Sequence, residues 1–295
     1  MAFKTILDQI GNTPLVEATH LVKKEGVRLL LKLEGNNPGG SVKDRAAFNM
    51  ISEALKRGDI KKGDTLVEST SGNTGIALAL IAQLLGLNMV IIMPENSTIE
   101  RVKTMRAYGA EVILTSVDVG IEGSRDLAYK LRDEKGYTLL NQFANNDNWK
   151  AHYKTTGPEI WEATKGKITH FVSAMGTTGT IMGVSRYLKE QNKNVTIVGA
   201  QPADGAKIPG IRKWPEAYLP EFFERERVDQ VVEVSEENAK ATTQRLAKEE
   251  GVFAGMSSGG SVYSALQIAE SIDEGLIVAI ICDRGDRYLS STLFE

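Results

Sequence analysis

Short β-rich runs alternate with helix-period segments along almost the whole chain. This alternation is typical of parallel sheets that are covered by helices on both faces. Strands are expected over residues 27–33, 65–69, 89–93, 111–115, 138–143, 170–174, 196–201, 230–234 and 277–282. Helices should begin near Ser41, Thr74, Ser97, Gly120, Asn148, Gly179, Ser235 and Ser258. Because so many strands would overextend one twisted sheet, the sequence predicts an α/β fold with two lobes and a cleft between them.

Composition excludes several classes of protein. Of the 295 residues, 42% are hydrophobic, enough to bury a large core. A net charge of -3, with lysines and arginines scattered along the chain, provides no basic surface for nucleic acid or an anionic membrane. The single cysteine, Cys282, cannot form an internal disulfide, and residues 1–5 lack an export segment. We therefore expect a cytoplasmic protein.

The apolar stretch 76–93 is interrupted by polar residues, which favours a helix and a strand over a membrane span.

Residues 65–75 lead from a strand through a small polar loop into an apolar helix. Such a loop presents backbone amides and hydroxyls at a helix start, where the helix dipole also favours an anion. The loop could hold the carboxylate of a substrate. An ordinary helix cap by Ser71 or Asn73 explains the same residues equally well.

The second loop of this kind, residues 171–180, contains Gly176 and Gly179 together with three threonines. Glycines permit close backbone approach and hydroxyls add donors, so the loop suits a phosphate. It has neither the GxGxxG spacing of dinucleotide sites nor the Gly-Lys-Ser/Thr ending of nucleoside-triphosphate sites. A simple tight turn is the alternative.

The third loop, residues 255–260, also opens a helix. Taken alone, it is more typical of a serine-capped turn than of a site. A serine nucleophile in this loop would need supporting Asp and His residues, and His20, His152 and His170 lie in no recognisable triad context.

Lys43 follows a Gly-rich turn and falls in the first turn of a predicted helix. At the positive end of a helix dipole a cationic amine is disfavoured, so this amine can be neutral or form an imine more easily. A solvated surface lysine is the alternative interpretation.

Together these stretches resemble the fold-type II pyridoxal-phosphate enzymes, and most closely the cysteine synthases, also called O-acetylserine sulfhydrylases. The resemblance extends from Ile10–Leu15 to Gly285–Ser290, with several motifs in the family's order. It implies two three-layer αβα lobes with mainly parallel sheets and pyridoxal 5'-phosphate in the cleft. It also implies β-replacement: O-acetyl-L-serine and sulfide give L-cysteine and acetate through an α-aminoacrylate.

The resemblance assigns a role to each matching residue. Lys43 would be the Schiff-base lysine and the catalytic base, Asn73 would bind the cofactor's ring hydroxyl, and Ser257 would face its pyridine nitrogen. The cofactor's phosphate would be held by Gly176, Thr177, Thr178, Gly179 and Thr180. The amino-acid carboxylate would be held by Thr70, Ser71, Asn73, Thr74 and Gln142. No metal is expected.

Residues 208–215 and 280–287 look like the signature segments of the B-type members. In that group Arg212 and Cys282 would approach the substrate and help accept thiosulfate, giving S-sulfocysteine. Lys213 stands where B-type members often carry a second arginine, and lysine is not equivalent to arginine for a planar oxyanion. For Cys282 a buried core position is the alternative.

On this resemblance, residues 1–37 plus 146–295 form the larger lobe with the phosphate loop. Residues 38–145 form a smaller, mobile lobe with the carboxylate loop. A homodimer is also implied. The alternatives are another fold-type II lyase, such as a serine/threonine dehydratase or a cystathionine β-synthase-like enzyme, or a non-catalytic assembly protein that retains the fold.

Overall fold

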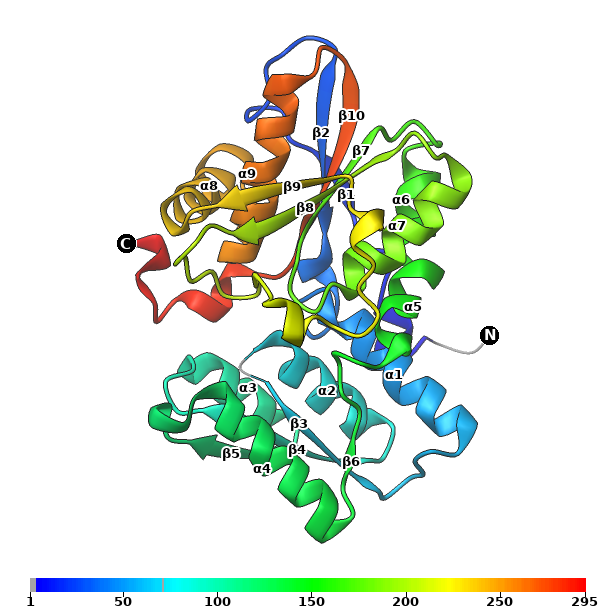
Figure 1. Cartoon of the computed structure of the whole chain (residues 1–295), viewed down its shortest axis with the longest axis vertical. Helices are drawn as coiled ribbons and strands as arrows, with labels where there is room; N and C mark the ends of the chain where they lie inside the picture. The colour runs from blue at the N-terminus through cyan, green and yellow to red at the C-terminus, as the bar shows by residue number, and fades with distance from the viewer. Residues whose placement is uncertain (1–3, 71) are drawn as a thin grey trace.

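The computed structural model describes residues 4–70 and 72–295, in which two sheets form two lobes, one above the other in Figure 1. The upper sheet has the strand order β1-β2-β10-β7-β8-β9. Its neighbours are parallel except for the pair β1 and β2. These strands are β1 (Leu15–Glu17), β2 (Val27–Leu33), β7 (His170–Ala174), β8 (Thr196–Pro202), β9 (Gln230–Val234) and β10 (Gly275–Ile281).

The lower sheet has the order β5-β4-β3-β6, and all its neighbours are parallel. Its strands are β3 (Thr65–Ser69), β4 (Asn88–Pro94), β5 (Glu111–Thr115) and β6 (Thr138–Leu139). Short 3₁₀ turns lie at residues 6–9, 34–36, 117–119, 216–218, 225–227, 285–288 and 292–294.

Helices cover both faces of the upper sheet. Leu29 and Leu31 of β2 pack towards α8 (Glu236–Glu250) and α9 (Met256–Ser271). Leu30, which points to the opposite face, packs towards α6 (Thr156–Ala163) and α7 (Gly179–Gln191). Because side chains alternate along a strand and both faces are buried, β2 is almost continuously apolar.

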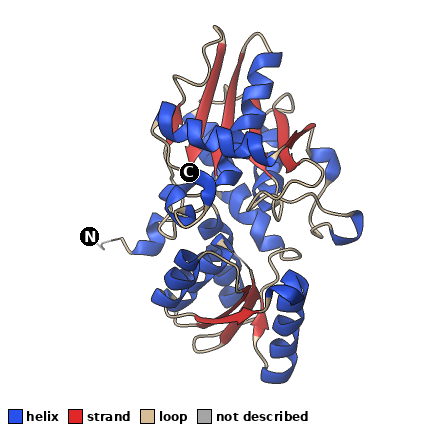
Figure 2. Cartoon of the chain, turned by 90° about the vertical axis from the view of Figure 1, so that its left-hand side faces the viewer, coloured by secondary structure: helices blue, strands red, loops and turns tan. Residues whose placement is uncertain are grey.

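The lower sheet is also covered on both faces, as Figure 2 shows from the side. One face packs against α1 (Lys43–Arg57), α2 (Asn73–Leu84) and α3 (Ile99–Ala107), and the other against α4 (Gly120–Lys135). The remaining α-helix, α5 (Asn146–Lys154), packs against both α1 and α7 and so connects the lobes. This architecture confirms the predicted fold class.

A buried ionic cluster joins α1 to the upper lobe. The guanidinium of Arg45 donates to Glu34 Oε2 at 2.7 Å and to Glu159 Oε1 at 2.6 Å. The ammonium of Lys32 donates to Glu159 Oε2 at 2.7 Å. Each charge is paired, which offsets the cost of removing it from water.

The predicted strands were confirmed to within two residues at each end, with one exception. Residues 140–143 were expected to continue the strand that begins at Thr138, and the structure shows that this expectation is wrong. The chain leaves the sheet after Leu139, and Asn141 adopts a left-handed backbone conformation with φ of 53°. The short edge strand β1 was not predicted. Residues 76–93 form part of α2 and of β4, and no described helix is long and apolar enough to cross a membrane.

Candidate active site

Three elements with predicted site residues meet at the carboxyl end of β10. The backbone N–H of Val42, directly before α1, donates to the carbonyl oxygen of Cys282 at 2.8 Å. The backbone N–H of Cys282 donates to Ser258 Oγ, near the start of α9, at 2.9 Å. Ligand sites of open α/β sheets lie at this end of the strands. The start of α1, the end of β10 and the start of α9 therefore adjoin one another.

Lys43, Cys282 and Ser257 lie close together at this junction. Lys43 is the first residue of α1 and is half-buried, and Ser257 is the second residue of α9 and is buried. Burial raises the pKa of the Cys282 thiol to about 11, against the opposing effects of the Lys43 charge and a hydrogen bond with Ser257. Cys282 is therefore a neutral thiol near pH 7, not a thiolate.

The loop before α7 has little room for larger side chains. A Cβ atom on Gly176 would lie 2.7 Å from the carbonyl oxygen of Gly210, and one on Gly179 would collide with the side chain of Asn148. Thr178 has a φ of 67°, which is uncommon for a β-branched residue. Its buried hydroxyl has no hydrogen-bond partner among the described residues. The loop thus combines close backbone approach with an unused hydroxyl donor.

A chain of hydrogen bonds connects this loop to the start of α2. The amide nitrogen of Asn148 lies 3.2 Å from Thr177 Oγ1 and 2.8 Å from the carbonyl oxygen of Gln142. The hydroxyl of Thr74 donates to Gln142 Oε1 at 2.9 Å. Thr70, which is also buried, lies just before this helix. The two loops predicted for phosphate and carboxylate are therefore linked through two amide side chains.

Asn73, the first residue of α2, is held by residues that the sequence did not identify as functional. Its amide nitrogen donates to Asp283 Oδ2 at 2.7 Å, and its amide oxygen accepts from the guanidinium of Arg287. Tyr288 also donates to Asp283 Oδ2, at 2.6 Å. Two signals were available: residues 280–287 resemble a family signature segment, and Asp283 follows the apolar strand β10, at the end where ligand-binding residues gather.

His152 is another residue that the sequence did not identify as functional. Its ring is buried, with Nε2 3.3 Å from Thr180 Oγ1 and Nδ1 2.9 Å from Thr156 Oγ1. Burial lowers the pKa of the imidazole to about 3, so the ring is neutral at physiological pH. Nothing in the sequence around His152 indicated this contact with the second loop.

The two cationic residues considered for sulfur-donor binding, Arg212 and Lys213, are exposed. Arg212 is exposed, and its guanidinium lies 5.5 Å from the ring centre of Trp214, whose indole N–H donates to the carbonyl oxygen of Gly176. Arg212 thus borders the second loop. Lys213 pairs at 2.7 Å with both Asp204 and Glu233. Ser71 lies outside the described residues.

The chemistry of these groups fits pyridoxal phosphate. The second loop has a free hydroxyl and close backbone at the start of α7, which suits a phosphate monoester. Lys43 provides an amine, and Ser257 a neutral hydroxyl, at the neighbouring junction. The described residues contain no group of three or more His, Cys, Asp or Glu side chains that could hold a metal ion.

The fold and the site are those of a pyridoxal-phosphate dependent enzyme. A family model with that description matches residues 6–283. Cysteine synthase B of Pseudomonas aeruginosa is 58% identical over 293 residues, which cover 99% of this chain and 98% of the relative. Cysteine synthase B of Escherichia coli is 57% identical, covering 98% and 96%. The chain belongs to the cysteine synthase B family of pyridoxal-phosphate dependent enzymes.

The solved structures agree with this assignment. The crystal structure of the cysteine synthase of Entamoeba histolytica superposes with a TM-score of 0.94 at 38% sequence identity. The match covers the whole of this chain and 91% of that one.

Proposed function

We propose that the protein is a cysteine synthase that converts O-acetyl-L-serine and sulfide into L-cysteine and acetate. The observation that carries the proposal is the identity of 57–58% to cysteine synthase B over almost the full length. The neighbouring positions of Lys43, Cys282 and Ser257 support it, because the reaction needs an amine and a neutral hydroxyl at one cofactor.

Pyridoxal phosphate, when bound, supplies the electron sink that acidifies the α-proton of the amino acid. Lys43 would hold the cofactor, and its Nζ would then take the α-proton as general base. Once acetate has left Cβ and hydrosulfide has added there, Lys43 Nζ would return the proton to Cα. Ser257, a neutral partner for the ring nitrogen, would leave that nitrogen largely unprotonated and thereby favour β-elimination over transamination.

The remaining residues would bind and orient. Gly176, Thr177, Thr178, Gly179 and Thr180 would hold the phosphate, and Asn73 the ring hydroxyl. The substrate carboxylate would be bound by Thr70, Ser71, Thr74 and Gln142, with closure of this loop excluding water. Residues 38–145 would move as the smaller lobe against residues 1–37 and 146–295. We also propose a homodimer in the cytoplasm, with no nucleic-acid or membrane partner.

Thiosulfate is the proposed second sulfur donor. A dianion larger than sulfide needs positive charge near Cβ, and Arg212 at the edge of the second loop is the candidate. Cys282 would contribute from the junction beside Lys43.

The test supplies purified, cofactor-loaded protein with O-acetylserine and, in turn, sulfide, thiosulfate, homocysteine or no acceptor. We expect cysteine from sulfide and S-sulfocysteine from thiosulfate. Cystathionine as the main product would indicate a cystathionine β-synthase-like enzyme. Pyruvate from L-serine, supplied in place of O-acetylserine without an acceptor, would indicate a dehydratase. A protein that takes up no cofactor would be a non-catalytic relative.

A further inference from the structure

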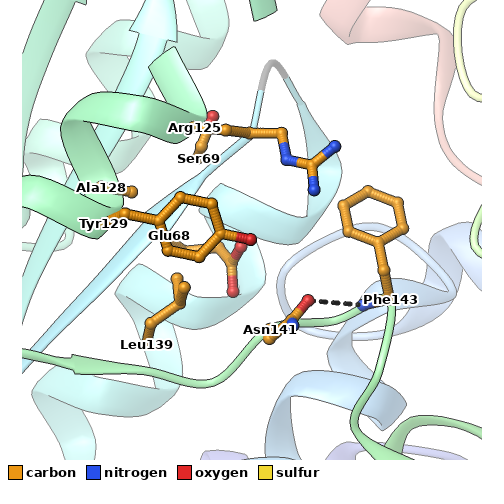
Figure 3. A pocket seen from close by; sticks show the side chains of 8 residues that line it. All are labelled: Glu68, Ser69, Arg125, Ala128, Tyr129, Leu139, Asn141 and Phe143. Atoms are coloured by element: carbon orange, nitrogen blue, oxygen red, sulfur yellow. Dashed lines mark hydrogen bonds between the residues drawn. The ribbon is translucent and has the colours of Figure 1, made fainter. Parts of the chain in front are cut away.

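Two buried carboxyls near the predicted site residues, Glu68 and Asp283, have no role in the proposed mechanism. Each has one carboxyl oxygen without a hydrogen-bond partner among the described residues. Glu68 lies in the pocket of Figure 3, and none of the described residues that line this pocket is a proposed cofactor-binding residue. Asp283 instead contacts Asn73, the proposed partner of the cofactor's ring hydroxyl. Asp283 is therefore the carboxyl that can influence the cofactor.

Asp283 lies shortly after β10 and is 1% exposed. Its Oδ2 accepts from the amide nitrogen of Asn73 at 2.7 Å and from the hydroxyl of Tyr288 at 2.6 Å. Its backbone forms an antiparallel bridge with Ser41, two residues before Lys43. A carboxylate accepts hydrogen bonds and donates none, so Asp283 can only receive an N–H of Asn73.

The guanidinium of Arg287 contacts the other end of the same amide. It donates to Asn73 Oδ1 and to the carbonyl oxygen of Gly39. Arg287 is 8% exposed, and a Cβ atom on Gly40 would collide with its guanidinium. A guanidinium donates hydrogen bonds and accepts none. The Asn73 amide therefore lies between an acceptor at its nitrogen and a donor at its oxygen.

These two neighbours permit only one orientation of the Asn73 amide. Turning the amide by 180° would set its oxygen against the Asp283 carboxylate and its nitrogen against the Arg287 guanidinium. Both hydrogen bonds would then be lost, since two acceptors or two donors would face each other. In the observed orientation Asp283 uses one of the two N–H groups. The second N–H makes no hydrogen bond within the described residues and is the donor left for a ligand.

We propose that Asp283 and Arg287 are positioning residues that turn an N–H of Asn73, and not its oxygen, towards the ring oxygen of the cofactor, and so favour the ionised form of that oxygen. The inference rests on the proposed function, because it assumes that the ring hydroxyl binds at Asn73. A donated hydrogen bond stabilises an anion, whereas an amide oxygen in the same place would favour the protonated hydroxyl.

The test determines the ionisation of the ring oxygen from the absorbance of bound pyridoxal phosphate. The band at longer wavelength belongs to the ionised oxygen and the band at shorter wavelength to the hydroxyl, and their ratio is measured at one pH. Asp283→Ala removes the acceptor at the amide nitrogen. We expect the ratio to fall at least about threefold, which corresponds to the loss of one hydrogen bond. Loss of a negative charge alone would raise the ratio, so a fall reports the lost orientation.

Two further variants separate orientation from general destabilisation. Asp283→Asn should not lower the ratio, because its amide oxygen can still accept from Asn73 and Tyr288. Tyr288→Phe is the matched control, since it removes the other hydrogen bond to the same carboxylate oxygen. It should lower the free energy of unfolding in urea and leave the ratio of the two bands unchanged. A fall in either variant equal to that in Asp283→Ala would overturn the proposal.

A double variant tests the route of the effect. Asn73→Ala should itself lower the ratio, and Asp283→Ala should then cause no further fall. An unchanged ratio in Asp283→Ala, or a further fall in the double variant, would contradict the proposal. If Asp283→Ala does not fold, the shorter polar side chain of Asp283→Ser takes its place. Failure of both variants to fold would assign the carboxyl to the fold alone and would also overturn the proposal.

These spectra do not depend on turnover. If the unsubstituted protein took up the cofactor but formed no cysteine, the proposed function would fail while the Asp283 comparison still gave an answer. An unchanged ratio in Asn73→Ala would mean that the ring oxygen lies elsewhere. That result would overturn the inference and leave the proposed sulfur chemistry unaffected.

Discussion

At the scale of single residues, Lys43 has the most demanding proposed role. It opens α1 beside the end of β10, next to Cys282 and Ser257. Lys43→Ala should lower kcat for cysteine formation by at least about 10³-fold, because the α-proton loses its base. Borohydride reduction followed by peptide mapping should place the pyridoxyl label on Lys43 in the unsubstituted protein. A label on another lysine would contradict the assignment.

The donor preference is also decided by single residues. Arg212→Ala should reduce thiosulfate use about tenfold while leaving sulfide use nearly unchanged, because only the larger dianion needs a bidentate partner. Lys213→Ala is the matched comparison and should have a smaller effect, since Asp204 and Glu233 already pair with the Lys213 ammonium. Rates with both donors decide the question. Equal loss on the two donors would mean that Arg212 supports the loop and does not recognise thiosulfate.

At the scale of elements, the loop before α7 depends on the absence of a side chain. Gly176→Ala would bring a Cβ atom within 2.7 Å of the Gly210 carbonyl oxygen, and a backbone atom cannot move aside alone. We therefore expect faster loss of cofactor, at least about tenfold, on gel filtration in cofactor-free buffer. Thr178→Val, which removes the unpartnered hydroxyl, should act in the same direction.

Gly58→Ala provides the control for this prediction. No atom lies within 4 Å of a Cβ at Gly58, although its φ of 79° also disfavours alanine. It should reduce stability by about 1 kcal/mol and leave cofactor retention unchanged. Equal cofactor loss in both variants would show that general destabilisation, not the shape of the loop, is responsible.

At the scale of the whole molecule, burial of ionisable groups sets the pH dependence of stability. Burial raises the pKa of Glu68 to about 8 and that of Asp44 to about 7, above their ordinary values of 4.5 and 3.8. The folded state then binds more protons than the unfolded chain between those values, so stability falls as pH rises through this window. His152 affects stability at acidic pH. Its pKa of about 3, against 6.5, means that stability also falls as pH drops below 6.5.

Glu68→Gln should remove part of the decrease in stability that occurs at alkaline pH. Between pH 6 and pH 9 the Glu68 carboxyl accounts for about 2–3 kcal/mol of lost unfolding free energy, on the basis of 1.36 kcal/mol for each pKa unit. Urea unfolding at the two pH values, on the protein and on the variant, measures the difference. Parallel pH profiles would show that Glu68 titrates in the folded state as it does in the unfolded chain.

Much of the fold was predictable because local pattern dictates it. The strand limits 27–33, 65–69, 111–115 and 170–174 were predicted to the residue, since turn residues bound each apolar run. The three polar loops could be located because Gly, Ser and Thr precede a helix in each, after a strand in the first two and after a short apolar run in the third. The family and the cofactor followed from these same motifs.

The tertiary structure alone decided which distant residues meet and which ionisable groups are shielded from water. The strand pattern of 138–143 did not reveal that pairing stops at Leu139 and that Asn141 takes a left-handed backbone conformation, because strand pairing depends on where the neighbouring strand β3 lies. Likewise Asn73 was found by motif, but its partners Asp283 and Arg287 lie more than 200 residues away. Sequence periodicity reports which face of an element is buried. Contacts between elements, and the pKa shifts that burial causes, depend on how the lobes pack.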